Sequence, residues 1–416
     1  MLSAERWKAD IARVLDLELK ALLLETSHAI HSDPELAFKE HHACERLTTM
    51  LHEAGFQITH PAGGLETAFR ADLPGDRSGP TIAVLAEYDA LPDVGHGCGH
   101  NIIATSALGA ALAMARCDRD FAGRLSVVGT PAEEAGGGKI LLAEAGVLRD
   151  VDAAIMLHPA TRNLVRRGSL AMSVVELIFH GKAAHAAGSP DLGVNALQAV
   201  IQTFVGLDAQ RIHMRADARV HGIITEGGDA VNIIPSRAAA RFSVRASDRA
   251  YQRHLVERLR RSANGAATST GSTLEWIEHR GYDNMVPNPT IAETIAQNMR
   301  ALGLEVVEPV PGERMGSTDM GDVSQLLPAV HAYFAIGPET LPGHSLEFAA
   351  AAAGPDGDAA VINGAKALGM TVADLLATPD LLESAQAEYR QMLESGQVAG
   401  WERWLAAGQQ YEGAPV

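Results

Sequence analysis

The sequence predicts an α/β protein in which a mostly parallel sheet carries a smaller, inserted α+β domain. At both ends of the chain, short apolar segments alternate with helical segments, as they do in parallel sheets with crossover helices. Between residues 171 and 287 the order of the elements changes. At 416 residues the chain is also long enough for two hydrophobic cores. We therefore expect one domain from residues 1–170 and 288–416, and a second from 171–287.

The first part of the chain is expected to be helical and then to alternate. Apolar residues at helical spacing predict helices within residues 7–57, and Asp33-Pro34-Glu35 predicts the start of the second of these helices. Nearly continuous apolar runs predict buried strands at 81–86, 124–129 and 153–157. Helices are predicted between them, at 101–115 and 139–145. In such sheets, ligands gather at the carboxyl ends of the strands.

The inserted region has the pattern of a small α+β sandwich. Its predicted order is strand, helix, strand, strand, helix, strand, at residues 173–180, 193–211, 218–225, 238–245, 251–260 and 272–277. The earlier pattern resumes with a helix at 291–302. The Ala-rich segment 348–353 is interpreted as the start of a buried helix.

Composition excludes several classes of partner. Lys and Arg number 34 against 51 Asp and Glu, a net charge of −17 that disfavours nucleic acid and anionic membrane surfaces. No uninterrupted apolar run reaches the roughly 20 residues of a membrane span. With only three cysteines, a disulfide framework is not expected. This low number favours a reducing compartment. These features predict a cytoplasmic protein.

A cysteine, a histidine and two glutamates follow two of the predicted strands. The segment from Gly95 to Asn101 contains Cys98 and His100, and Glu133-Glu134 lies in a turn bounded by proline and glycines. A free cysteine is usually a small buried hydrophobe, and adjacent glutamates are often solvated. Together, however, Cys, His and Glu are the ligands that zinc and similar ions select. Because all follow strand ends, we expect them to share one site.

Two further histidines complete a possible ligand set. His158 ends a predicted strand, and His344 lies in a turn with Pro342 and Gly343. In isolation such a histidine is more often a hydrogen-bonded turn residue. Together with Cys98, His100 and Glu134, these two histidines make five candidate ligands, about the number that two closely spaced ions need.

Several motifs in order along the chain carry a resemblance to a known family. They are Asp33-Pro34-Glu35-Leu36, Glu87-Tyr88-Asp89-Ala90-Leu91-Pro92, Gly95 to Asn101, Pro131 to Glu134, Gly181 to Ala186, Val231 to Pro235, Gly316 to Asp319 and Gly343-His344. With them the chain resembles the dinuclear-metal aminoacylase and carboxypeptidase family. The most similar branch contains p-aminobenzoyl-glutamate hydrolase, indole-acetyl-amino-acid hydrolases and β-alanyl dipeptidase relatives.

The resemblance implies roles for the metal-site residues. Cys98 would bridge two divalent ions, zinc or manganese, and His100, Glu134, His158 and His344 would complete their shells. Glu133 would be the general base. Where much of the wider family has a His-x-Asp pair, this chain has Glu87-Tyr88-Asp89. Asp89 is therefore expected to orient a ligand. Whether Glu87 or His96 contacts metal stays open.

The resemblance also assigns residues to the inserted domain, which would act as a lid and form a homodimer. His185 would reach the site of the partner subunit and stabilise the oxyanion. The substrate would be held by Asn232, Arg245, Ser317 and Thr318. Other candidates for binding the substrate carboxylate are Arg166, Arg167 and Arg241.

The expected activity is hydrolysis of the amide bond of an N-acyl amino acid or dipeptide-like substrate. The alternative is a non-catalytic metal- or amino-acid-binding protein on the same scaffold. The presence of the base and all five ligand candidates favours the enzyme. A serine hydrolase is disfavoured because no Gly-x-Ser-x-Gly segment occurs.

Overall fold

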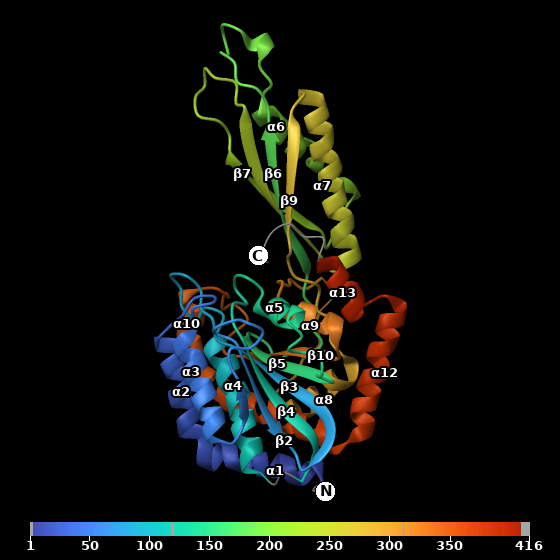
Figure 1. Cartoon of the computed structure of the whole chain (residues 1–416). Helices are drawn as coiled ribbons and strands as arrows, with labels where there is room; N and C mark the ends of the chain where they lie inside the picture. The colour runs from blue at the N-terminus through green and yellow to red at the C-terminus, as the bar shows by residue number, and fades with distance from the viewer. Residues whose placement is uncertain (1–2, 118–119, 311, 409–416) are drawn as a thin grey trace. The chain divides into compact units, whose positions relative to one another are not determined.

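The computed structural model describes residues 3–117, 120–310 and 312–408, which form two compact units. Within these residues, the first unit comprises 3–168, 285–313 and 319–404. The second comprises 169–284, 314–318 and 405–408. In Figure 1 the first unit takes the blue and red ends of the chain, and the second takes the green and yellow middle.

A six-stranded sheet forms the centre of the first unit. Its strands lie in the order β1 (Gln57–Thr59), β2 (Phe69–Pro74), β4 (Ala122–Thr130), β3 (Arg77–Glu87), β5 (Ala153–Ala160) and β10 (Ala329–Ala335). β4, β3, β5 and β10 run parallel, whereas β2 is antiparallel to β4 and β1 to β2. The predicted fold class, a mostly parallel sheet with a second α+β part, is confirmed. β1, β2 and β10 were not predicted from the sequence.

Two apolar helices cover the middle of this sheet. α4 (His100–Arg116) and α11 (Pro355–Ala377) pack against each other and on β3 and β5. By length and composition α11 alone among the described helices could cross a membrane, but 78% of its most apolar window is buried inside the protein. It is therefore a core helix, which explains why it is mostly apolar.

The N-terminal helices pack on α4 and α11. They are α1 (Ala4–Val14), a π-helical turn (Leu15–Leu19), α2 (Lys20–Ser32) and α3 (His41–Glu53). The unit is completed by α5 (Gly138–Glu144), α8 (Pro289–Ala301), α9 (Met320–Leu326), α10 (Leu346–Ala352) and α12 (Pro379–Ser395), and α13 (Gly400–Gly408) follows. α10 buries Phe348, Ala349 and Ala352, as expected of the Ala-rich segment.

The prediction that a helix starts at Asp33 is wrong. α2 ends at Ser32, α3 begins at His41, and residues 33–40 form a connecting segment. The Glu35 carboxylate accepts hydrogen bonds from the backbone N–H groups of His42 (3.0 Å) and Ala43 (2.9 Å). The acidic residue of the predicted helix start therefore does cap a helix, but one that begins a few residues later.

The second unit is an antiparallel sheet covered by two helices. The strand order is β7 (Arg219–Glu226), β8 (Arg237–Ala246), β6 (Ala171–His180) and β9 (Thr273–His279). α6 (Ala196–Asp208) and α7 (Arg249–Thr270) pack on each other and on the sheet, and short 3₁₀ turns lie at Pro190–Leu192 and Arg211–His213. Asn195 and Asp248 cap the two helices. α7 runs beyond the predicted residue 260, continues through Gly265, and ends where Gly271 adopts the left-handed conformation (φ +73°).

Candidate metal centre

A glycine turn between β3 and α4 presents Cys98 and His100. Gly99 has φ +74°, and a Cβ atom there would lie 2.5 Å from Cγ of Pro159. Only glycine fits this close approach. His100 follows directly as the first residue of α4. The backbone N–H of His344 donates to the carbonyl of Gly97 (3.0 Å), which ties a distant loop to the same turn.

Hydrogen bonds set the tautomers of two histidines. His100 Nδ1 lies 2.9 Å from the Asp89 carbonyl oxygen and 3.0 Å from Asp89 Oδ1. His158 Nδ1 lies 2.6 Å from the carbonyl oxygen of Pro159. Because these partners can only accept, each Nδ1 carries the proton. Nε2 is therefore the atom of each ring that is left to bind a metal. Although burial lowers the pKa of His100, Asp89 and Glu87 raise it well above its usual range, so a metal on this Nε2 would replace a proton.

The side chains of His158 and His344 converge on the sulfur of Cys98. Cys98 Sγ lies 3.6 Å from His158 Nε2 and 3.4 Å from His344 Nε2. Glu134 lies between two of the histidines, with Oε2 3.7 Å from His344 Nε2 and Oε1 3.9 Å from His100 Nε2. Two groups able to hold an ion share the cysteine: Cys98, His100 and His158, and Cys98, Glu134 and His344.

The spacing of these atoms fits a metal ion. With ligand bonds of about 2.0–2.3 Å, neighbouring ligands on a tetrahedral ion lie about 3.3–3.8 Å apart. In addition, His100 Nε2, Glu134 Oε1 and Glu87 Oε2 are buried without a hydrogen-bond partner in the described part of the chain. Buried polar atoms are rarely left unsatisfied. The residues present therefore fit divalent cations at this place.

The comparison with protein families agrees with this geometry. Residues 83–368 match the model of peptidase family M20/M25/M40. The chain belongs to this family. As a member of the M20 family it is a hydrolase of the metallopeptidase and amidohydrolase type, and the resemblance stated from the sequence is confirmed.

Curated relatives cover most of this M20 peptidase. Mouse Xaa-Arg dipeptidase is 38% identical over 89% of this chain and 90% of its own length. A p-aminobenzoyl-glutamate hydrolase polypeptide from Escherichia coli is 29% identical, covering 88% of this chain and 91% of that one. Among solved structures, a dinuclear metal-binding M20 peptidase from Bacillus subtilis has a TM-score of 0.68 at 23% identity. It covers 86% of this chain and 99% of that one. This last likeness shows the fold.

Glu133 and Glu134 lie in a turn directly after β4. Glu133 is buried, and the backbone N–H of Glu134 donates to Asp89 Oδ2 (2.9 Å). Burial, together with the charges of Glu87, Asp319 and Glu134, raises the pKa of Glu133 well above its usual range. Cations bound beside it would act in the opposite direction. Asp89 thus contacts both His100 and the glutamate turn.

Burial also acts on Cys98 and His158. It raises the pKa of the Cys98 thiol and, together with the charge on His100, lowers the pKa of His158 to about 4. His158 is therefore neutral, the form that binds metal. A buried thiol with a raised pKa becomes a thiolate when a cation coordinates it.

Sequence reasoning missed Lys139, which is fully buried beside these residues. Its Nζ donates to Glu87 Oε1 and to Asp319 Oδ1 (2.6 Å), and its backbone N–H donates to Asp319 Oδ2 (3.0 Å). Burial alone would lower the pKa of Lys139, but the two carboxylates raise it. Glu87 Oε2 remains 3.4 Å from His100 Nε2. A single lysine at the start of an otherwise apolar helix was the sequence signal for this network.

The remaining candidates near the first unit's sheet lie outside the cluster. His96 Nε2 contacts the carbonyl oxygen of Ile30 (3.1 Å), and its ring stacks on His31. Arg166 pairs with Glu293 and Glu308, each at 2.6 Å, and Arg167 pairs with Glu313 (3.0 Å). The two arginines are therefore neutralised and are not the open carboxylate-binding pair considered from the sequence.

The substrate-site candidates belong to the second unit, where the structure forms two pairs. The backbone N–H of Ala186 donates to the carbonyl of Asn232 (2.9 Å), which places His185 and Asn232 in adjoining segments. Arg245 Nη1 approaches Ser317 Oγ (3.5 Å). Thr318 follows Ser317 and is buried.

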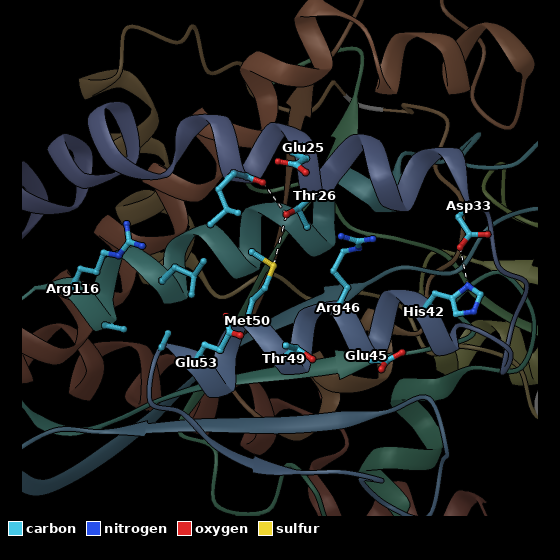
Figure 2. Close-up of a pocket in the computed structure, with 14 residues that line it drawn as sticks. Glu25, Thr26, Asp33, His42, Glu45, Arg46, Thr49, Met50, Glu53 and Arg116 are labelled. Atoms are coloured by element: carbon cyan, nitrogen blue, oxygen red, sulfur yellow. Dashed lines mark hydrogen bonds and ion pairs between the residues drawn. The ribbon is translucent and has the colours of Figure 1, made fainter.

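A separate cavity lies between α2, α3 and the end of α4. Figure 2 shows residues of the three helices around it, including Glu25, Met50 and Arg116. It has a volume of about 870 Å³ and shares no lining residue with the Cys98 cluster. Charged side chains line its rim and it is open to solvent, so its lining residues are not arranged as a set of ligands around one point.

We expect Lys139→Met to destabilise the protein by about 3–5 kcal/mol, because Glu87 and Asp319 would be left as buried, uncompensated carboxylates. Chemical denaturation measures this loss. Lys20→Met, on the exposed surface of α2, is the control and should change stability by less than about 0.5 kcal/mol. Adding Glu87→Gln to Lys139→Met should recover part of the loss. Equal stability of the two lysine variants would contradict the ion-pair interpretation.

Proposed function

We propose that this M20 peptidase hydrolyses the amide bond of a dipeptide or N-acyl amino acid with two divalent ions, zinc or manganese, bridged by Cys98. The observation that carries the proposal is the convergence of His158 and His344 on the Cys98 sulfur. His100 and Glu134 would complete the shells. When bound, such ions lower the pKa of coordinated water and polarise the substrate carbonyl.

Glu133 is proposed as the general base. It is buried next to the candidate ligand Glu134, and its raised pKa means that it can hold a proton. In this role Glu133 takes a proton from the attacking water and passes it to the leaving amine. Proton transfer of this kind contributes roughly 10²–10⁴-fold to a rate.

Two arginines of the second unit are proposed to bind the substrate carboxylate. Arg241 and Arg245 line a cavity of about 410 Å³ over β6, β7 and β8, together with Met172 and Val174. Neither arginine has an acidic partner among the residues that the structure describes. An arginine without a counter-charge is suited to a carboxylate, which it binds through paired N–H groups. Ser317, beside Arg245, can add a hydrogen bond.

His185 is proposed to stabilise the oxyanion. Its Nδ1 accepts the backbone N–H groups of Ala187 (3.2 Å) and Gly188 (3.0 Å). The ring proton is therefore on Nε2, which is left as a donor. A fixed donor is what a developing oxyanion requires. Asn232 and Thr318 are proposed to contribute further polar contacts to the substrate.

The second unit is also proposed to form a homodimer. Its sheet ends in the edge strand β7, where Ile223 and Ile224 are 64% and 46% exposed. On α6, Val205 is 64% exposed. Free strand edges with exposed apolar side chains commonly pair with another chain.

The names of the relatives suggest the first substrates to test. Because one relative is named Xaa-Arg dipeptidase and another p-aminobenzoyl-glutamate hydrolase, we would assay dipeptides ending in arginine and p-aminobenzoyl-glutamate. Both compounds carry the free carboxylate for which Arg245 is proposed.

Cys98→Ala should lose at least one of two bound ions per chain, because two of the three candidate ligand groups among the described residues use this sulfur, and the third is His100, Glu133 and Glu134. Elemental analysis after loading with zinc or manganese gives the metal content. Cys117→Ala removes another free cysteine, at the end of α4, and should keep both ions. Unchanged metal content in Cys98→Ala would refute the bridging role.

Glu133→Gln should retain both ions and lower kcat by roughly 10²–10⁴-fold, since glutamine cannot accept the proton from water. Steady-state hydrolysis of the assay substrates measures kcat. Glu383→Gln, exposed on α12, serves as the control with wild-type kcat. Normal turnover of Glu133→Gln would show that the base is another group. A wild-type protein that binds metal and substrate without turnover would favour the non-catalytic alternative.

Arg245→Met should raise KM about 10–100-fold for substrates with a free carboxylate, in line with the loss of a charged hydrogen bond. KM for the corresponding C-terminal amides should change much less. Arg166→Met is the matched control, because that guanidinium is already paired with two glutamates. The same rise in KM for acids and amides would rule out carboxylate recognition by Arg245.

A further inference from the structure

Glu40 is a fully buried carboxylate that accepts three hydrogen bonds. Its Oε1 accepts the backbone N–H groups of Phe38 (3.0 Å) and Ala132 (2.9 Å). Its Oε2 accepts the hydroxyl of Thr67 (2.7 Å). The carboxylate thus joins the segment before α3 to the turn after β4, far away in the sequence.

The position of Glu40 in the sequence does not by itself explain where its carboxylate points. Glu40 is the residue directly before α3, where a side chain would normally cap the helix, yet its carboxylate makes no capping bond. Glu35 caps α3 instead, through the N–H groups of His42 and Ala43. The side chain of Glu40 is therefore not required for the helix start, and a different function must explain its direction.

Ala132, whose N–H donates to Glu40, has an unfavourable backbone conformation. Ala132 has φ +60° and is fully buried. A residue with a Cβ atom rarely adopts this left-handed conformation, and it persists only where the surroundings enforce it. Ala132 directly precedes Glu133, so its backbone angles set the direction in which Glu133 leaves the strand. The hydrogen bond from Ala132 to Glu40 is one of the contacts that enforce this turn.

The other side of Glu133 is held in the same way. The N–H of Glu134 donates to Asp89 Oδ2 (2.9 Å), and Asp89 Oδ1 contacts His100 Nδ1. The backbone is therefore bound by one buried carboxylate before Glu133 and by another after it. Of these two carboxylates, only Asp89 touches a candidate metal ligand.

Further contacts fix the connecting segment from which Glu40 extends. The ring of Phe38 packs over Gly136, where a Cβ atom would lie 2.4 Å from Phe38 Cε2. Figure 2 shows Asp33 and His42 facing each other where α2 ends and α3 begins, with a 2.8 Å contact. Both ends of the segment are thus tied together, and its middle rests on the turn that carries Glu133.

We propose that Glu40 is a positioning residue that holds Ala132 in its left-handed conformation and thereby fixes Glu133 for proton transfer. This inference rests on the proposed function of Glu133 as the base. It assigns a function to the segment Asp33 to Glu40, whose motif in the sequence predicted only a helix start and carried part of the family resemblance.

The electrostatics of Glu40 are consistent with a side chain kept for its acceptor oxygens. Burial raises the pKa of Glu40 to about 7, and the hydrogen bonds from Thr67 and Ala132 act against this shift. The titratable groups facing it are Cys44 on α3 and Tyr88 and Asp89 after β3. None of them supplies a positive charge, so backbone and hydroxyl donors alone stabilise the carboxylate.

The test compares three variants of the full, metal-loaded chain. Glu40→Ala should lower kcat about 10–100-fold, with KM within about twofold and metal content unchanged, because a small displacement of a reacting group has effects of that size. Glu40→Gln keeps an acceptor for Phe38 and Ala132 and should retain kcat within about threefold. Thr67→Val removes the third hydrogen bond only and should leave kcat unchanged.

A second measurement does not depend on turnover. Hydrogen–deuterium exchange, followed by mass spectrometry of peptides spanning residues 131–136, should be about tenfold faster in Glu40→Ala and unchanged in Thr67→Val. If Glu40→Ala does not fold, Glu40→Asp replaces it with the same expectation, because the shorter side chain no longer reaches Ala132.

The outcomes separate this inference from the proposed function. An active wild type with normal kcat in Glu40→Ala, or equal losses in Glu40→Ala and Thr67→Val, would overturn the positioning role and leave the base assignment intact. An inactive wild type would refute the proposed function. In that case, an unchanged rate of hydrogen–deuterium exchange in Glu40→Ala would also overturn the inference. Faster exchange would support the claim that Glu40 stabilises the turn around Ala132.

Discussion

Compensation of buried charge is the constraint on which the Cys98 cluster depends. Glu87, Asp89 and Asp319 are essentially inaccessible to water, and Glu133 and Glu134 are nearly so. Uncompensated, such a concentration of carboxylates would oppose folding. Lys139 neutralises one side of the group through Glu87 and Asp319, and His100 contacts Asp89. The remaining carboxylates, Glu133 and Glu134, form a group with His100 that could hold an ion, and divalent cations would compensate their charge.

Strained backbone delivers the side chains to that space. Ala132 and His344 have positive φ without being glycine, and Gly99 has positive φ beside Pro159. Each of these residues is, or lies next to, a candidate ligand or the candidate base. Conformations of this kind persist only where the surrounding structure imposes them. Here hydrogen bonds from Ala132 to Glu40 and from His344 to Gly97 are among the contacts of these residues. The centre is thus built on rigid strand ends but shaped by contacts from distant segments.

The strongest local patterns were predicted correctly, and the failures have physical reasons. Continuous apolar runs located β3, β4 and β5, because strands buried on both faces need apolar residues throughout. The edge strands β1 and β10 and the antiparallel strand β2 were missed, since their short or mixed patterns become strands only by pairing with neighbours. The motif at Asp33 carries true capping chemistry, but Glu35 acts on a helix that begins later. Lys139 and Glu40 carry no local signal of their partners, which lie far away in the chain.

By itself, the sequence determined the fold class, the family resemblance and the candidate metal ligands, because periodicity and ligand chemistry follow from residue types and short spacings. Tertiary structure alone decided which atoms face one another. Only the folded chain shows that Cys98 lies between His158 and His344. Likewise, only there do Arg166 and Arg167 meet acidic partners that neutralise them. Distance and charge compensation between remote residues depend on how the strands and loops pack, and no short stretch of sequence contains that information.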